Sequence, residues 1–239
     1  MSPEISIVIP VYNEAENIPP LVQEVVQAFA GREHEIVLVD DCSDDSSWEI
    51  LQGLRVEYPQ LRALRHSRRC GQSTAVCNGV KAARAAIIGT LDGDGQNDPA
   101  DLTTLLQALH AADRRVAMVA GWRTKRKDSA IKLMSSRIAN SVRRSLLQDG
   151  TPDTGCGIKV FYREVFIGLP YFDHMHRFLP ALVQRAGRTV ISVPVQHRPR
   201  LAGKSKYGVW NRLWIGIVDL LGVAWLIRRS QHPSVEELS

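Results

Sequence analysis

The chain has 239 residues, of which 44% are hydrophobic and 23% are charged. This balance is typical of a globular protein and excludes a disordered or fibrous chain. A chain of this length can bury one substantial core, so we expect one main domain with an appendage. The 4 cysteines form no C-x-x-C pair, and neither a zinc site nor a disulfide framework is indicated.

The net charge of +5 is unevenly distributed along the chain. Residues 120–150 contain eight lysines or arginines and two aspartates, and no acidic residue occurs from Arg185 to Arg212. A local excess of this kind favours an anionic partner, such as a phosphorylated substrate or a lipid headgroup, although a solvated helix face is the commoner cause. The basic windows contain no nucleic-acid-binding motif, so we expect no nucleic-acid partner.

Five apolar runs predict strands at residues 5–10, 35–39, 61–65, 86–91 and 116–121. Helical patterns lie between them. In the first helical pattern, apolar residues recur at helical spacing from Leu21 to Phe29, and Gly31 is a suitable stop. Strands that alternate with helices indicate an α/β fold with a Rossmann-like, mostly parallel sheet and helices on both faces.

Three of these strands end in polar, acidic turns. The turns are Pro10-Val11-Tyr12-Asn13-Glu14, Asp40-Asp41-Cys42-Ser43 and Asp92-Gly93-Asp94-Gly95-Gln96. In an open parallel sheet, ligands bind at the carboxyl ends of the strands, so we expect the three turns to line one cleft.

The third turn has the chemistry of a divalent-cation site. Carboxylate and amide oxygens suit Mg²⁺ or Mn²⁺, and such an ion keeps coordination positions for substrate phosphates. Asp94 and Gln96 are the preferred ligands, and Asp92 joins them directly or through water. The alternative is that Asp-Gly pairs serve only as ordinary turn residues.

Seven segments occur in an order that resembles the inverting glycosyltransferases of family 2, in particular their dolichol-phosphate mannose synthase-like branch. They are IVIPVYNEAENI, IVLVDDCSDDS, GQSTAVCNGVKAA, LDGDGQNDP, GWR, DTGCGIKVF and RLAGKSKYG, and they extend over most of residues 5–208. The resemblance implies a GT-A fold, a UDP- or GDP-sugar donor, a Mg²⁺ or Mn²⁺ cofactor and, commonly, a polyprenyl phosphate acceptor.

The resemblance also assigns residues to the donor. It implies a nucleotide-sugar site built from Pro10, Tyr12, Glu14, Asp40, Asp41, Gln72 and Asp92. The residue types suit this role, because a tyrosine ring can stack on a base and a carboxylate can accept a hydrogen bond from its imino N–H. Gln72 opens a helix whose N-terminal N–H groups can face a diphosphate or ribose. A core tyrosine and a solvated acidic turn are the alternative.

A phosphate acceptor is already anionic near neutral pH, so it needs cations rather than a general base. By resemblance, Arg123, Arg137 and Arg200 hold acceptor or donor phosphates, and Ser205 and Lys206 complete the clamp. Together with Asp92 and Asp94, the three arginines form the expected catalytic set. A saccharide acceptor would require a general base, for which Asp153 is the nearest candidate. The sequence departs from the usual small-residue pattern at Cys156, for which we have no catalytic role.

Two segments bear on membrane attachment. Residues 129–147 predict an amphipathic helix that lies either on a membrane surface or on the sheet. We assign residues 1–208 to the glycosyltransferase domain and residues 209–239 to a C-terminal apolar helix and tail. The apolar part, 213–227, contains Asp219 and is too short to span a bilayer. Its tryptophans and flanking arginines favour a membrane interface, and a docking or dimer helix is the alternative.

The prediction from sequence is therefore an enzyme that transfers a sugar from a nucleotide-diphosphate donor to a polyprenyl phosphate with inversion, for cell-envelope glycan or lipid modification. The chain start lacks the pattern of a secretory signal, so we expect a cytoplasmic protein, peripheral on the cytoplasmic face of the membrane. Alternatives are a saccharide or soluble acceptor and a non-catalytic nucleotide-binding protein. The sugar, the base (with a mild preference for uridine) and a homo-oligomeric state stay open.

Overall fold

The computed structural model describes residues 2–124, 143, 145–199 and 209–231. Its centre is a 7-stranded sheet in the order β3-β2-β1-β4-β6-β5-β7. The strands are β1 (Ile5–Val11), β2 (His34–Asp40), β3 (Leu61–Arg65), β4 (Ile87–Thr90), β5 (Val116–Arg123), β6 (Lys159–Tyr162) and β7 (Thr189–Val195). All neighbours are parallel except β6, which is antiparallel to both β4 and β5. The five predicted strands and the mostly parallel sheet are confirmed.

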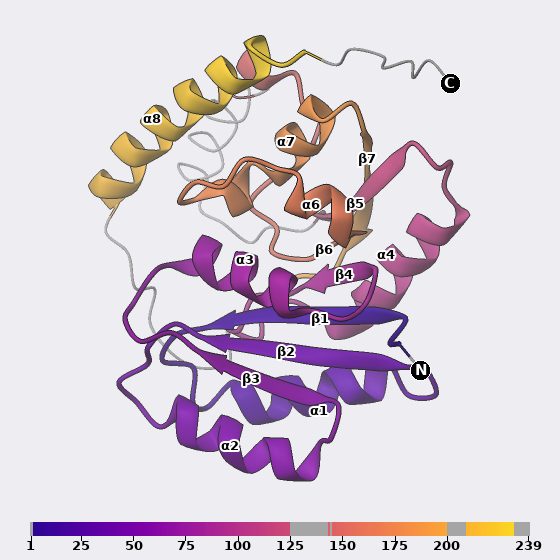
Figure 1. The fold of residues 1–239 in the computed structure, drawn as a ribbon, viewed down its shortest axis with the longest axis vertical. Helices are drawn as coiled ribbons and strands as arrows, with labels where there is room; N and C mark the ends of the chain where they lie inside the picture. Colours follow the sequence, from indigo (N-terminus) through magenta and orange to yellow (C-terminus); the bar gives the residue numbers. More distant parts are fainter. Residues whose placement is uncertain (1, 125–142, 144, 200–208, 232–239) are drawn as a thin grey trace, which may run out of the picture.

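Helices cover both faces of the sheet (Figure 1). On one face, α1 (Ile18–Ala28), α2 (Ser47–Glu57) and α4 (Pro99–Ala111) contribute to a core cluster with the apolar side chains of β1 and β2. On the other face, α3 (Gln72–Ala82), α6 (Arg163–Ile167), the 3₁₀ turn η1 (Met175–Arg177), α7 (Leu179–Arg185) and α8 (Val209–Arg228) contribute to a second cluster. Both faces of the central strands are therefore buried, which explains their continuous apolar sequences.

The start of α4 and the end of α1 follow from local sequence features. At the start of α4, the Asp98 carboxylate accepts a hydrogen bond from the Ala100 N–H, and Pro99 occupies the first turn. The apolar side of α1 (Leu21, Val22 and Val25) is buried as its spacing predicts, and the chain leaves this helix through Gly31 with φ of 78°.

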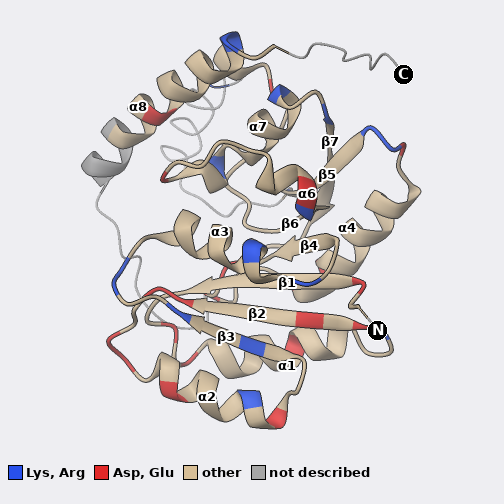
Figure 2. Ribbon diagram, in the orientation of Figure 1, with Lys and Arg blue, Asp and Glu red and all other residues tan. Residues whose placement is uncertain are grey.

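Helix α8 packs one side against the second core cluster and leaves another side exposed. Val223 and Ala224 are buried, and the Arg185 guanidinium donates a hydrogen bond to the Leu226 carbonyl at 2.9 Å. Ile215, Val218, Leu221 and Trp225 are exposed. Figure 2 shows little charge along the described part of α8, apart from one acidic position and its basic end. Among the described residues, no helix combines the length and apolarity needed to cross a membrane.

The predicted helix at 129–147 falls mostly outside the described residues, and only positions 143 and 145–147 are recorded as helical.

Candidate active site

A cleft of about 420 Å³ opens at the carboxyl ends of the central strands. It brings together most of the site residues expected from sequence. Those that line it are Pro10, Tyr12, Glu14, Asp41, Gln72, Asp92, Asp94 and Gln96. The three acidic turns therefore meet in one place, because β1, β2 and β4 run parallel and end at the same edge of the sheet.

Asp92 is fixed at the centre of this cleft by its neighbours. Its Oδ1 atom accepts a hydrogen bond from Gln72 Nε2 at 2.8 Å, and its backbone N–H donates to Asn97 Oδ1 at 3.2 Å. The backbone at Gly157 passes so close that a Cβ atom there would lie 2.1 Å from Asp92 Oδ2. Residue 157 must therefore lack a side chain for Asp92 to occupy this position.

The electrostatics of Asp92 suit a cation site. Burial raises the pKa of Asp92, and the nearby Asp94 carboxylate raises it further, against the opposing effects of Lys159, Gln72 and Arg123. Two carboxylates so close together repel each other, and a divalent cation would relieve that repulsion.

The third expected metal ligand, Gln96, is held in the same turn. Its backbone N–H donates to Asp94 Oδ1 at 3.2 Å, and its side-chain Nε2 donates to the Arg198 carbonyl at 3.4 Å. With the amide nitrogen used in this way, the amide oxygen is the atom that could bind a metal. The donor set of two carboxylates and one amide oxygen fits Mg²⁺ or Mn²⁺.

Only one member of the Asp40-Asp41 pair reaches the cleft. Asp41 lines it, whereas Asp40 is fully buried beside Arg65 Nε at 3.1 Å and the Ser43 backbone N–H. Successive side chains at the end of a strand point to opposite faces, so both carboxylates cannot face one ligand. The sequence-based assignment of Asp40 to the nucleotide pocket therefore does not fit its position.

Arg123 and Asp153 bind each other. Arg123 Nε and one terminal nitrogen donate to the two carboxylate oxygens of Asp153 at 2.7 and 2.9 Å. Burial acts to lower the pKa of Arg123, but the hydrogen bonds and charge of Asp153 outweigh it, and the pKa is raised. Neither residue lines the cleft. In this arrangement Asp153 is poorly suited to act as a general base, and the Arg123 guanidinium is already engaged. Arg137, Arg200, Ser205 and Lys206 lie outside the described residues.

Lys159 is a cleft-lining cation that the sequence analysis missed. It is 4% exposed, its ammonium donates a hydrogen bond to the Cys156 carbonyl, and it lines the cleft near Asp92. Burial lowers the pKa of Lys159, an effect that Cys156, Asp92 and Asp153 oppose. The sequence feature that could have revealed it is a lone lysine within the apolar segment GIKVF.

The turn η1 supplies two further residues that the sequence analysis missed. His176 and Arg177 both line the cleft. The Ser73 hydroxyl lies 2.7 Å from His176 Nδ1, and burial, assisted by Arg177 and Lys159, lowers the pKa of His176 to about 3. The ring is therefore neutral at physiological pH, and Arg177 is the charged member of this pair. They lie outside every motif and basic stretch singled out in the sequence, so no local pattern marked them.

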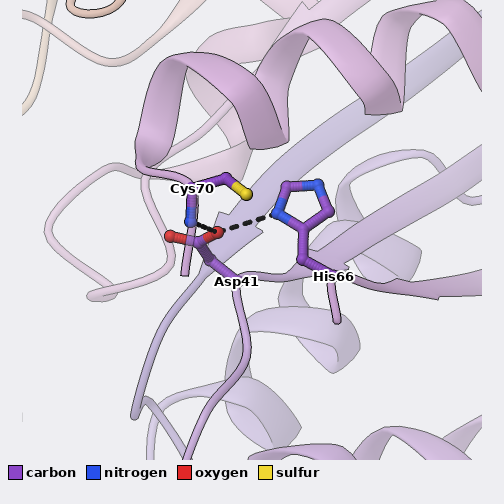
Figure 3. Close-up of side chains that lie close together, drawn as sticks. All are labelled: Asp41, His66 and Cys70. Atoms are coloured by element: carbon purple, nitrogen blue, oxygen red, sulfur yellow. Dashed lines mark hydrogen bonds and ion pairs between the residues drawn. The ribbon is translucent and has the colours of Figure 1, made fainter. Parts of the chain in front are cut away.

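A cationic side chain lies over the ring of Tyr12 in the cleft. The Arg69 guanidinium lies 4.1 Å from the centre of the Tyr12 ring and also lines the cleft. Asp41, which also lines the cleft, accepts hydrogen bonds from the backbone N–H group of Cys70 (Figure 3) and from that of Gly71.

A mostly parallel sheet with acidic strand ends and a cleft lined by carboxylates and cations is the arrangement expected of a nucleotide-sugar-dependent glycosyltransferase. Residues 6–169 match the model of glycosyl transferase family 2. The chain therefore belongs to this family, as its motifs indicated.

Relatives in this family are polyprenyl-phosphate sugar transferases by name. The chain is 33% identical over 236 residues to the dodecaprenyl-phosphate galacturonate synthase of Rhizobium johnstonii, covering 96% of this chain and 69% of the relative. It is 33% identical over 209 residues to the undecaprenyl-phosphate 4-deoxy-4-formamido-L-arabinose transferase of Edwardsiella ictaluri, covering 86% of this chain and 63% of the relative. The chain thus spans about two thirds of the length of these relatives.

Solved structures share the fold. The mannosyltransferase PcManGT from Pyrobaculum calidifontis, in complex with GDP-Man and Mn²⁺, has a TM-score of 0.69 at 21% identity, covering 98% of this chain and 66% of its own. The glucosyl-3-phosphoglycerate synthase from Mycobacterium tuberculosis, in complex with Mg²⁺ and UDP, has a TM-score of 0.68 at 15% identity, covering 97% and 81%. At these identities the likeness is one of fold, and it confirms the predicted GT-A architecture.

Proposed function

We propose that the protein transfers a sugar from a UDP- or GDP-sugar to a polyprenyl phosphate, with inversion at the anomeric carbon. The observation that supports this most is that one cleft holds groups of both kinds. The carboxylates of Asp92 and Asp94 and the amide of Gln96 line it, and so do the cations Lys159 and Arg177. A site that handles a metal diphosphate and a second phosphate requires both kinds of group.

In this proposal, the acidic turns bind the nucleotide-sugar donor. Tyr12 offers a ring face for the base, and Asp41 offers a carboxylate that can accept the imino N–H of uracil or guanine. A Mg²⁺ or Mn²⁺ ion held by Asp94 and Gln96, with Asp92, would offset the negative charge that develops on the leaving diphosphate. Gln72 holds the Asp92 carboxylate in the orientation that this role needs.

The acceptor is a phosphate, whose oxygen is anionic without help from a base. In our scheme that oxygen attacks the anomeric carbon from the side opposite the diphosphate, which inverts the configuration. Lys159 and Arg177 stabilise the phosphate charges in the cleft. The pairing of Asp153 with Arg123 agrees with a reaction that uses no carboxylate base.

A polyprenyl acceptor requires the protein to work at a membrane surface. The exposed apolar side of α8, from Ile215 to Trp225, and the arginines at its end suit the headgroup region of an anionic bilayer. We therefore propose a peripheral protein on the cytoplasmic face of the membrane. The names of the relatives, which include dodecaprenyl and undecaprenyl phosphate, support this acceptor.

The test is a screen of radiolabelled UDP- and GDP-sugars against a short polyprenyl phosphate, with Mg²⁺ or Mn²⁺, scored by label that enters the organic phase. We expect transfer to the phosphate and none to the matching polyprenyl alcohol. Label that appears only in water-soluble products would contradict the lipid acceptor. Equal transfer to the alcohol would indicate a general base that this scheme does not contain.

A further inference from the structure

Asp41, His66 and Cys70 form a compact cluster beside the cleft (Figure 3). They come from the ends of β2 and β3 and from the residue before the N-cap of α3. His66 Nδ1 lies 2.7 Å from Asp41 Oδ1. The backbone N–H of Cys70 donates to the same oxygen at 2.7 Å, and that of Gly71 donates to Asp41 Oδ2 at 2.8 Å.

The geometry of this cluster is that of a hydrogen-bond network rather than a metal site. Two ligand atoms on one tetrahedral zinc ion, each at about 2.1 Å, lie roughly 3.4 Å apart. The 2.7 Å between His66 Nδ1 and Asp41 Oδ1 is too short for that and is normal for a direct hydrogen bond. The Cys70 thiol, for its part, donates to the Arg68 carbonyl at 3.3 Å.

The second ring nitrogen of His66 identifies its tautomer. Asn78 Nδ2, from α3, lies 2.9 Å from His66 Nε2. An amide NH₂ can only donate, so Nε2 accepts, and in the neutral ring Nδ1 then carries the hydrogen. His66 therefore donates to Asp41. Three N–H groups, from His66, Cys70 and Gly71, therefore point at the oxygens of this carboxylate.

We propose that His66, oriented by Asn78, is a positioning residue that sets the base preference of the donor site. It holds Asp41 as an acceptor, and such a carboxylate favours a base whose ring nitrogen carries a hydrogen. Uracil N3 and guanine N1 carry one, whereas cytosine N3 and adenine N1 present lone pairs that repel a carboxylate, although both bases also have an amino group beside that nitrogen. This inference rests on the proposed function, in which Asp41 contacts the base.

The test compares binding of UDP, GDP, CDP and ADP by calorimetry in the presence of Mn²⁺. Wild type is expected to prefer UDP or GDP over CDP and ADP. His66→Leu removes the group that holds the Asp41 carboxylate in place, so this side chain must be ordered when the nucleotide binds, and affinity for the preferred nucleotide should fall by about tenfold. His66→Asn places an amide N–H near the position of Nδ1 and should restore most of the affinity. His110, a histidine on α4 away from the cleft, gives the matched control His110→Leu.

Kinetics separate positioning from catalysis and from folding. His66→Leu should raise KM for the donor and leave kcat nearly unchanged. Asn78→Ala, which does not touch Asp41, should shift KM in the same direction by a smaller factor. Two outcomes would overturn this inference and leave the proposed function standing. One is wild-type nucleotide affinity in His66→Leu. The other is an equal loss of affinity in His66→Leu and His66→Asn, with equal falls in Tm.

Two further results would contradict the inference about His66 on other grounds. If wild type bound neither UDP nor GDP, the proposed function would fail and this inference with it. Stoichiometric zinc in the purified protein, lost in Cys70→Ser, would replace the hydrogen-bond network with a metal site.

Discussion

The Gly157 backbone lies so close to Asp92 that even a methyl side chain at residue 157 would collide with the carboxylate. A Cβ atom at residue 157 would lie 2.1–2.6 Å from the atoms of the Asp92 carboxylate. We predict that Gly157→Ala displaces this carboxylate and lowers transfer by at least about a hundredfold, with an overpacking cost of about 1–3 kcal/mol in stability. Steady-state transfer rates and urea unfolding measure the two effects.

Gly53 provides the matched control. It lies in α2, and a Cβ atom there would meet nothing within 4 Å. Gly53→Ala should keep full activity and gain about 0.5–1 kcal/mol, because alanine suits a helix interior better than glycine. Wild-type activity in Gly157→Ala would show that Asp92 does not need its observed position.

Asp94 is the residue whose loss should remove the metal without harming the fold. It lies in a partly exposed turn rather than in the core. We predict that Asp94→Ala abolishes transfer while the free energy of unfolding changes by less than about 1 kcal/mol. The assay is run with Mn²⁺ raised to saturation. Activity close to that of wild type under these conditions would reject the metal assignment.

At the residue scale, the sequence predicted those parts of the site that follow from strand ends. Asp92, Asp94 and Gln96 meet Tyr12 and Asp41 because parallel strands end at one edge. The position of Asp40 was not predictable, because a pattern of two adjacent carboxylates does not say which one points inward, and the structure buries Asp40.

Other site residues depend on contacts between distant segments, which local patterns do not contain. The pairing of Arg123 with Asp153 joins residues 30 positions apart. Lys159 reaches the cleft only because β6 is reversed relative to its neighbours.

At the element scale, the packing of α8 also could not be predicted from local sequence patterns. Its apolar run was evident in the sequence, but which side faces the protein was not. The structure buries Val223 and Ala224 and exposes Leu221 (58%) and Trp225 (59%). The strands β6 and β7 were not predicted either, since β6 has 4 residues and β7 is a partly exposed strand that contains Pro194.

Substitutions on the two sides of α8 should have opposite effects on membrane binding and stability. Replacing Leu221 and Trp225 by serine removes exposed apolar surface, so it should abolish sedimentation with anionic liposomes and leave Tm nearly unchanged. Val223→Ala removes buried methyl groups and should lower stability by about 1–2 kcal/mol without affecting liposome binding. Co-sedimentation and thermal melts on both variants test this. If the intact protein failed to sediment, or if the serine variant melted early, α8 would instead be covered by protein.

At the scale of the whole molecule, one histidine should make stability depend on pH. The pKa of His176 is lowered from 6.5 to about 3 in the folded protein. Between these values the unfolded chain binds a proton that the folded protein does not, so stability falls as the pH decreases through this window. The slope from this group is at most about 1.4 kcal/mol per pH unit.

The variant His176→Asn tests this without removing the link to α3, since the asparagine amide can replace Nδ1 beside the Ser73 hydroxyl. Urea unfolding between pH 4 and 7.5, within and just above the window, should show a shallower slope for His176→Asn than for wild type. Parallel slopes would mean that other groups account for the acid sensitivity.

The reversal of β6 also bears on the order of folding. The segments with the nucleotide motifs are joined by consecutive parallel strands and helices, whereas Gly157 reaches Asp92 only when β6 inserts between β4 and β5. The contact joins residues more than sixty positions apart, and closing such a long loop is slow compared with forming a helix. During refolding, helical circular dichroism should therefore return before transfer activity, which requires Asp92 to be seated against Gly157 by the insertion of this one short strand.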